Sequence, residues 1–155
     1  MKKIACALFF VGVGVSASAF AEPMAVPADG AVTAGAGGNC VLLSENIRLN
    51  LSSNVVGAFN CDEATNTISI GTCHNAGSRN SSLTCAQIGV DSATGNGIFN
   101  HPDCDAAAVA AGTVIEGAPD FRGFFSQTSG GSVAPSFLGG SCSEQILTAH
   151  ENLSN

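Results

Sequence analysis

The fold of this chain is decided by residues 55–73, which read VVGAFNCDEATNTISIGTC. Residues 55–61 form a short apolar run, and residues 67–73 alternate isoleucine with serine and glycine, which is the period-two pattern of a half-buried strand. Residues 62–66 separate the two runs with turn-forming side chains. This stretch therefore predicts an antiparallel hairpin.

Further strands are predicted on both sides of this hairpin. Residues 47–51 alternate apolar with polar side chains, and a strand is expected around residues 83–90, after a turn rich in Gly, Ser and Asn at residues 75–80. Residues 113–140 carry apolar clusters split by Gly and Pro, which indicates short strands and loops. Consecutive hairpins are the simplest topology for this pattern.

Two helices are predicted as well. Residues 106–111 read AAAVAA, where Asp103 or Asp105 can cap the start and Gly112 can end the helix. A second helix is expected from Ser143 onward, because the following apolar residues and one histidine share a helical face; these are Ile146, Leu147, His150 and Leu153. The predicted class is mainly β with minor α: a small single-domain antiparallel β fold with one short internal helix and a C-terminal helix.

The N-terminus predicts export. Lys2 and Lys3 precede an apolar run over residues 4–15, and residues 19–21 give the small-x-small pattern of a cleavage site, so residues 1–21 are interpreted as a signal peptide. The short basic start is typical of bacteria and predicts a periplasmic or extracellular location. No later window approaches the roughly 20 apolar residues that spanning requires, so no transmembrane span is expected after cleavage.

The cysteines define the rest of the domain organisation. Residues 22–38 are rich in Gly, Ala and Pro and are predicted to be a flexible leader, and residues 39–155 a disulfide-stabilised β-rich domain. Six cysteines follow residue 21, and an even number in an exported chain indicates three disulfides, which six cysteines can form in fifteen ways. The six are Cys40, Cys61, Cys73, Cys85, Cys104 and Cys142.

The charge balance excludes one class of partner. From residue 22 onward only Arg48, Arg79 and Arg122 oppose twelve acidic residues, which gives a net charge of −9. A nucleic-acid backbone requires clustered cations, so no nucleic-acid partner is expected. The acidity favours solubility of an exported protein.

One group of residues could bind a divalent metal. His101, Asp103 and Asp105 fall within five positions, and imidazole and carboxylate groups are ligands for zinc, or the carboxylates alone for calcium. A turn that caps a helix and presents the disulfide cysteine Cys104 explains the same residues. No other cofactor is predicted.

Haem and redox motifs are missing from the sequence. A c-type haem site ending at Cys73-His74 would need a cysteine at the position of Ile70, and no CxxC pair occurs. No GxSxG elbow for a nucleophilic serine occurs either. The catalytic residues of any enzyme activity therefore stay unknown, and a small secreted hydrolase that pairs His74 or His101 with a nearby acid is kept as an alternative.

The segment at residues 120–125, DFRGFF, carries the main binding hypothesis. It holds half of the phenylalanines that follow residue 21, next to the last arginine. If exposed, Phe121, Arg122, Phe124 and Phe125 would bind a protein partner or drive self-association, because aromatic residues and arginine dominate interface energetics; if buried, they would be core. We expect a non-enzymatic, exported cell-envelope or extracellular structural or binding protein, with a secreted hydrolase or an exported metal-binding protein as alternatives.

Overall fold

A computed structural model describes residues 22–154. It is mainly antiparallel β, with 42% of residues in strands, 11% in helices and three disulfides, which confirms the predicted fold class. The predicted signal peptide, residues 1–21, lies outside the described residues.

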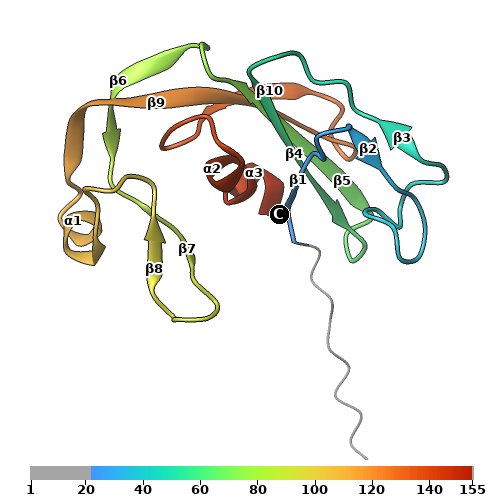
Figure 1. The fold of residues 1–155 in the computed structure, drawn as a ribbon, viewed down its shortest axis with the longest axis horizontal. Helices are drawn as coiled ribbons and strands as arrows, with labels where there is room; N and C mark the ends of the chain where they lie inside the picture. The colour runs from blue at the N-terminus through green and yellow to red at the C-terminus, as the bar shows by residue number, and fades with distance from the viewer. Residues whose placement is uncertain (1–21, 155) are drawn as a thin grey trace, which may run out of the picture.

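The strands and helices follow one another along the chain as Figure 1 labels them. They are β1 (Met24–Ala25), β2 (Ala31–Val32), β3 (Ile47–Arg48), β4 (Val55–Asp62), β5 (Thr67–His74), β6 (Arg79–Thr84), β7 (Gln87–Val90), β8 (Gly97–Phe99), α1 (Ala106–Ala110), β9 (Val114–Gln127), β10 (Val133–Phe137), α2 (Glu144–Thr148) and α3 (Glu151–Ser154).

The predicted hairpin is the centre of the main sheet. β4 and β5 pair from Val55 opposite His74 to Asp62 opposite Thr67. In the turn, the Asp62 carboxylate accepts two backbone N–H bonds and one hydroxyl bond, and Asn66 adopts a positive φ of 54°. Asp and Asn are the residues that stabilise such turns, so the hairpin prediction is confirmed.

Six strands form this sheet, in the order β1-β4-β5-β9-β10, with β6 paired to the first part of β9. α2 and α3 pack against one side of the sheet, which we call the inner face (Figure 1). There Leu147 and Leu153 are fully buried in a cluster with Ala58 and Phe125. The other side is the outer face, where Val32 and other residues of the N-terminal segment pack over β4 and β5.

Residues 22–38, predicted to be a flexible leader, are instead paired and packed. β1 pairs with β4, β2 pairs with β3, and Val26 and Val32 are 7% and 2% exposed. Both valines pack in one cluster with Phe59 and Cys61, which lie much later in the chain. This nonlocal burial offsets the ordering entropy that makes the segment look unstructured by composition. The packed part of the chain therefore begins before residue 39.

β9 runs unbroken for 14 residues where short strands and loops are predicted. Its register against β6 shifts between Asn80 and Ser82, which marks a bulge in the longer strand. Gly117 has a φ of 79° there, and Pro119 lies close by. A bulge can hold a glycine with positive φ, and it can also hold a proline, because the bulged residue needs no ladder hydrogen bond from its N–H. Gly117 and Pro119 therefore bend a continuous strand instead of ending it.

Beyond the bulge, β6 and β9 extend away from the main body and carry α1 and the β7–β8 hairpin (Figure 1). A small separate core joins Leu83 and Ala118 to one disulfide. α1 begins at Asp105, whose Oδ1 accepts the N–H of Ala108 at 2.7 Å, as predicted for an N-cap. The internal helix is therefore confirmed.

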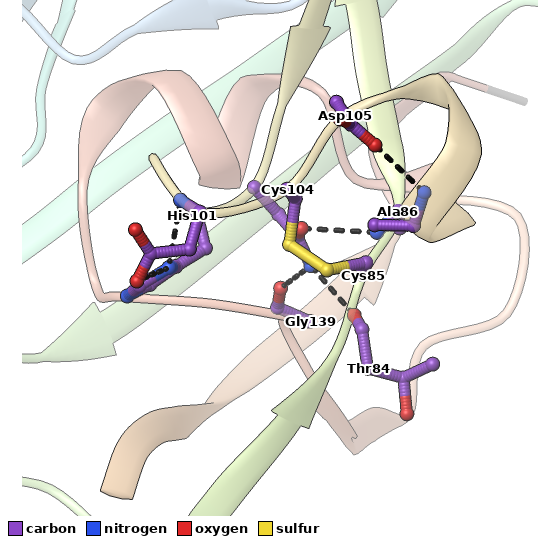
Figure 2. Close-up of a disulfide and its surroundings, with 10 residues drawn as sticks. Thr84, Cys85, Ala86, His101, Cys104, Asp105 and Gly139 are labelled. Atoms are coloured by element: carbon purple, nitrogen blue, oxygen red, sulfur yellow. Dashed lines mark hydrogen bonds and ion pairs between the residues drawn. A yellow bond between two sulfur atoms is a disulfide. The ribbon is translucent and has the colours of Figure 1, made fainter. Parts of the chain in front are cut away.

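Each of the three hydrophobic clusters contains one disulfide. All six predicted cysteines are paired, as Cys40–Cys61, Cys73–Cys142 and Cys85–Cys104. Figure 2 shows the third pair beside Thr84, Ala86 and Gly139. The side chain of Asn100 accepts the N–H of Ala86 and donates to the carbonyls of Thr84 and Gly139. At roughly 2–4 kcal/mol each, the disulfides contribute a large part of the net stability expected for a domain of this size.

The predicted C-terminal helix is two short helices, α2 and α3, separated at His150. The ring Nδ1 of His150 accepts the N–H of Asn152, so the histidine satisfies a donor at the start of α3. At the end of α3, the side-chain amides of Asn60 and Gln127 donate to the carbonyls of Leu153 and Asn152. Two side chains of the sheet therefore satisfy carbonyl groups at the end of α3 that would otherwise have no hydrogen-bond partner.

Candidate functional site

The DFRGFF segment lies in β9, and its side chains are divided between the two faces of the sheet. Phe121 and Phe125 are 8% and 4% exposed and belong to the inner core cluster. Phe124 is 49% exposed. Because alternate residues of a strand point to opposite faces, Arg122 and Phe124 share the outer face. Of the four predicted partner-binding residues, the structure leaves two on the surface and makes two core.

β10 extends this surface. Phe137 lies opposite Arg122 in the β9–β10 register, and the guanidinium carbon of Arg122 is 4.8 Å from the centre of the Phe137 ring. Phe137 and Val133 are 37% and 66% exposed. We call these four residues, Arg122, Phe124, Val133 and Phe137, the β9–β10 patch. A cation over an exposed ring contributes about 0.5–1 kcal/mol, so Arg122 has a preferred position on the patch.

An apolar groove borders the patch on the outer face. It lies between the β2–β3 ribbon and the main sheet and has a cavity volume of about 260 Å³. Its apolar lining includes Ile47 and Ile70, and Ser126 lies at the side nearest the patch. The complete lining is Val32, Cys40, Ile47, Leu49, Phe59, Ile68, Ile70, Ser126, Gln127 and Thr128.

The groove and the patch form one continuous surface. Ile70 pairs with Ser126, and Ser126 pairs with Val133, so these residues form one transverse row on the outer face. Phe124 and then Arg122 follow Ser126 on the same face of β9, at steps of two residues. A ligand can therefore contact the groove, the exposed Phe124 ring and the Arg122 guanidinium from one side of the molecule.

The electrostatics of this surface are unusual for so acidic a chain. Within residues 22–154, no arginine lies within ion-pair distance of a carboxylate. On this surface Arg122 lies over Phe137, and on the inner side of the sheet Arg79 lies over Phe121, with its guanidinium carbon 5.3 Å from the ring centre. The guanidinium groups are therefore held by aromatic rings and keep their hydrogen-bonding capacity for a ligand.

Asp120, the neighbour of this segment, has a structural role. Its Oδ1 accepts the backbone N–H bonds of Gly139 and Gly140 at 2.8 and 3.2 Å. Burial raises the pKa of the carboxyl group, and the two backbone bonds oppose that rise. Asp120 thus fastens the segment after β10 to β9.

The free edge of β10 is protected against pairing with another strand. The N–H of Leu138 donates to the carbonyl of Phe121 in β9. Because the direction of backbone groups alternates along a strand, those of Phe137, Pro135 and Val133 point away from β9, toward the free edge. Pro135 has no N–H to offer, and the Phe137 carbonyl contacts the His150 ring Nε2 at 3.1 Å. The His150 ring itself stacks on Phe125 at 4.4 Å. A partner therefore meets the face of these strands more readily than their edge.

The structure does not bring His101, Asp103 and Asp105 together as a set of metal ligands. His101 Nδ1 lies 3.6 Å from the Asp103 carboxylate and accepts the Asp103 N–H, whereas the Asp105 carboxylate caps α1. Among the described residues, no group of three His, Cys, Asp or Glu side chains is positioned to hold a metal. The turn-and-cap interpretation accounts for all three residues.

The histidines named for a hydrolase also bond to the backbone. His74 is exposed, and its Nδ1 accepts the N–H of Ala76 at 2.9 Å. His101 has Asp103 beside it, but no histidine ring in residues 22–154 is hydrogen-bonded to a serine or threonine hydroxyl. The described histidines therefore lack the nucleophile and base arrangement of serine catalysis.

Comparison with known proteins gives no relative to set beside this geometry. No protein-family model, curated protein or solved structure matches the chain. None of the helices in the described part of the chain has the length and hydropathy that crossing a membrane requires. The three disulfides indicate an oxidising, exported environment.

Sequence reasoning missed half of the patch and the whole groove. Phe137 and Val133 fall in residues predicted as short strands and loops, and the alternation from 133 to 137 is weak evidence for a strand because Pro135 interrupts it. Ile47 and Ile70 both lie in predicted strands, but their approach across the groove depends on tertiary packing. No local pattern in the sequence indicates that approach.

Proposed function

We propose that this chain is an exported cell-envelope or extracellular binding protein, without enzymatic activity, that contacts another protein through the β9–β10 patch. The observation that carries the proposal is the exposure of Phe124 and Phe137 beside Arg122. Only six phenylalanines follow residue 21, and two of them remain partly outside the core on one face. Exposed aromatic and arginine side chains on a rigid sheet are the features expected at the energetic centre of an interface.

The location of the protein is part of the same proposal. The basic and apolar start of the sequence supports secretion by a bacterium, and the disulfides agree with an oxidising compartment. The net charge of −9 after residue 21 favours a protein partner over a nucleic acid. Self-association through the patch is the second form that this binding function can take.

Site-specific photocrosslinking tests the proposal in the native host. A photoreactive phenylalanine analogue at position 124 should give crosslinked products that the same analogue at position 114 does not give. Val114 is the matched control, because it is also 49% exposed and also lies in β9. A product of twice the monomer mass would identify self-association, and a product of another mass a different partner. Equal products from both positions would contradict the proposal.

A further inference from the structure

The outer face combines an apolar groove, an exposed aromatic ring and a guanidinium group in one line. Ser126 at the edge of the groove and Arg122 are four residues apart in β9, which corresponds to about 13 Å along an extended strand. Phe124 lies halfway between them. An extended polypeptide presents every second side chain on one face with the same spacing, so three of its side chains can match these three positions.

Charge selects among the possible occupants of this surface. Arg122 has no carboxylate within ion-pair distance among residues 22–154, although the chain carries twelve acidic residues. Its guanidinium carbon lies 4.8 Å from the centre of the Phe137 ring. An incoming carboxylate could form a charge-assisted hydrogen bond with Arg122 without displacing an existing ion pair.

The same charge disfavours a symmetric pairing of two copies. A two-fold contact between identical patches would set each Arg122 against a patch that contains no carboxylate to pair with it. Edge-to-edge strand pairing through β10 is also hindered, because Pro135 lacks an N–H and His150 contacts the Phe137 carbonyl.

We infer that the partner is a protein that presents an extended acidic and apolar segment, with one apolar side chain in the groove, a second on Phe124 and a carboxylate on Arg122. This inference rests on the proposed function and adds the chemistry of the partner to it. The recognised pattern is apolar, any residue, apolar, any residue, acidic, read in either chain direction.

Selection from a library of random displayed twelve-residue peptides tests the inference. The baits are the oxidised protein from residue 22 onward and its Arg122→Glu, Phe124→Ser and Val114→Ser variants. The unsubstituted protein and Val114→Ser should enrich peptides with Asp or Glu four positions from an apolar residue. Arg122→Glu should change the enriched charge to Lys or Arg. A synthetic peptide of the selected sequence should bind Arg122→Gln at least roughly tenfold more weakly than the unsubstituted protein.

The outcomes separate this inference from the function on which it rests. Enriched apolar peptides that depend on Phe124 but show no charge preference would overturn the acidic partner and leave the binding surface in place. If no enriched peptide depends on Phe124, both proposals fail. A concentration-dependent dimer in light scattering that Phe124→Ser abolishes would overturn the inference in favour of a second copy. Matching thermal unfolding of the variants would show that each bait is folded.

Discussion

Loss of the Cys73–Cys142 disulfide should destabilise the protein more than loss of Cys40–Cys61. The two bonds join residues separated by 69 and 21 positions. The loop-closure relation then assigns roughly 4 kcal/mol to the first bond and roughly 3 kcal/mol to the second, a difference of about 1 kcal/mol. Burial does not confound the comparison, because each pair contains one cysteine that is 2% exposed and one that is 6% exposed.

Urea unfolding of the two double cysteine-to-alanine variants measures this difference. Both variants should unfold at lower urea than the oxidised protein, with the Cys73→Ala/Cys142→Ala variant lowest. The Cys85→Ala/Cys104→Ala variant is a second control, because its separation of 19 places it with the shorter loop. The loop-entropy reasoning is refuted if loss of Cys40–Cys61 lowers the free energy of unfolding as much as loss of Cys73–Cys142, with the same slope of that free energy against urea concentration. Local packing would then set the contribution of each bond.

Three further substitutions test the site and its supports. Asp105→Ala should lower the free energy of unfolding by about 1 kcal/mol through loss of the α1 cap, whereas the exposed Asp103→Ala should not, as urea titration would show. Gly123→Ala should cost about 1–3 kcal/mol, because the new methyl group would lie 2.7 Å from a Leu138 side-chain carbon, while Gly130→Ala meets nothing within 4 Å and should leave the unfolding midpoint unchanged. Asp120→Asn tests the effect of pH. Since burial raises the pKa of Asp120 above its ordinary value of 3.8, the folded state binds this proton more tightly than the unfolded state, and the Asp120 contribution to stability falls as pH rises through that window. The stability of the variant relative to the unsubstituted protein should therefore rise from pH 3.5 to pH 7, and a fall over this range would mean that the carboxylate bonds to the backbone outweigh its burial.

Structure that depends on neighbouring residues could be predicted from the sequence. The β4–β5 hairpin is encoded by two alternating runs and the turn between them, and α1 is encoded by Asp105 and the alanines that follow. The number of disulfides follows from the even count of cysteines after residue 21. Their pairing could not be predicted, since each pair joins residues brought together by tertiary packing.

Structure that depends on distant contacts was predicted less well. Val26 and Val32 lie in a segment with little apolar surface of its own, and their burial requires Phe59 from the central hairpin. In β9, Gly117 and Pro119 suggest an interruption, but the register shift against β6 absorbs them as a bulge.

The candidate site shows the same division between local and nonlocal information. The concentration of aromatic residues around Arg122 is visible in the sequence. Which rings point outward is set by the register of β9 between β5 and β10, and by helices α2 and α3 that cover one face only. The sequence therefore located the segment, and the tertiary structure is needed to separate Phe124 from Phe121 and Phe125.

The support beneath the patch connects the stability of the protein to the proposed binding. Cys73 in β5 lies directly opposite Gly123, the residue between Arg122 and Phe124. Its disulfide to Cys142 joins the inner side of these strands to the segment that leads into α2. The patch residues therefore lie on paired strands that a covalent bond holds from behind, which reduces the ordering cost of binding compared with a surface loop. The affinity of the patch for its partner should therefore fall when Cys73–Cys142 is reduced. Breaking Cys85–Cys104, which lies in a separate core, should have little effect on that affinity.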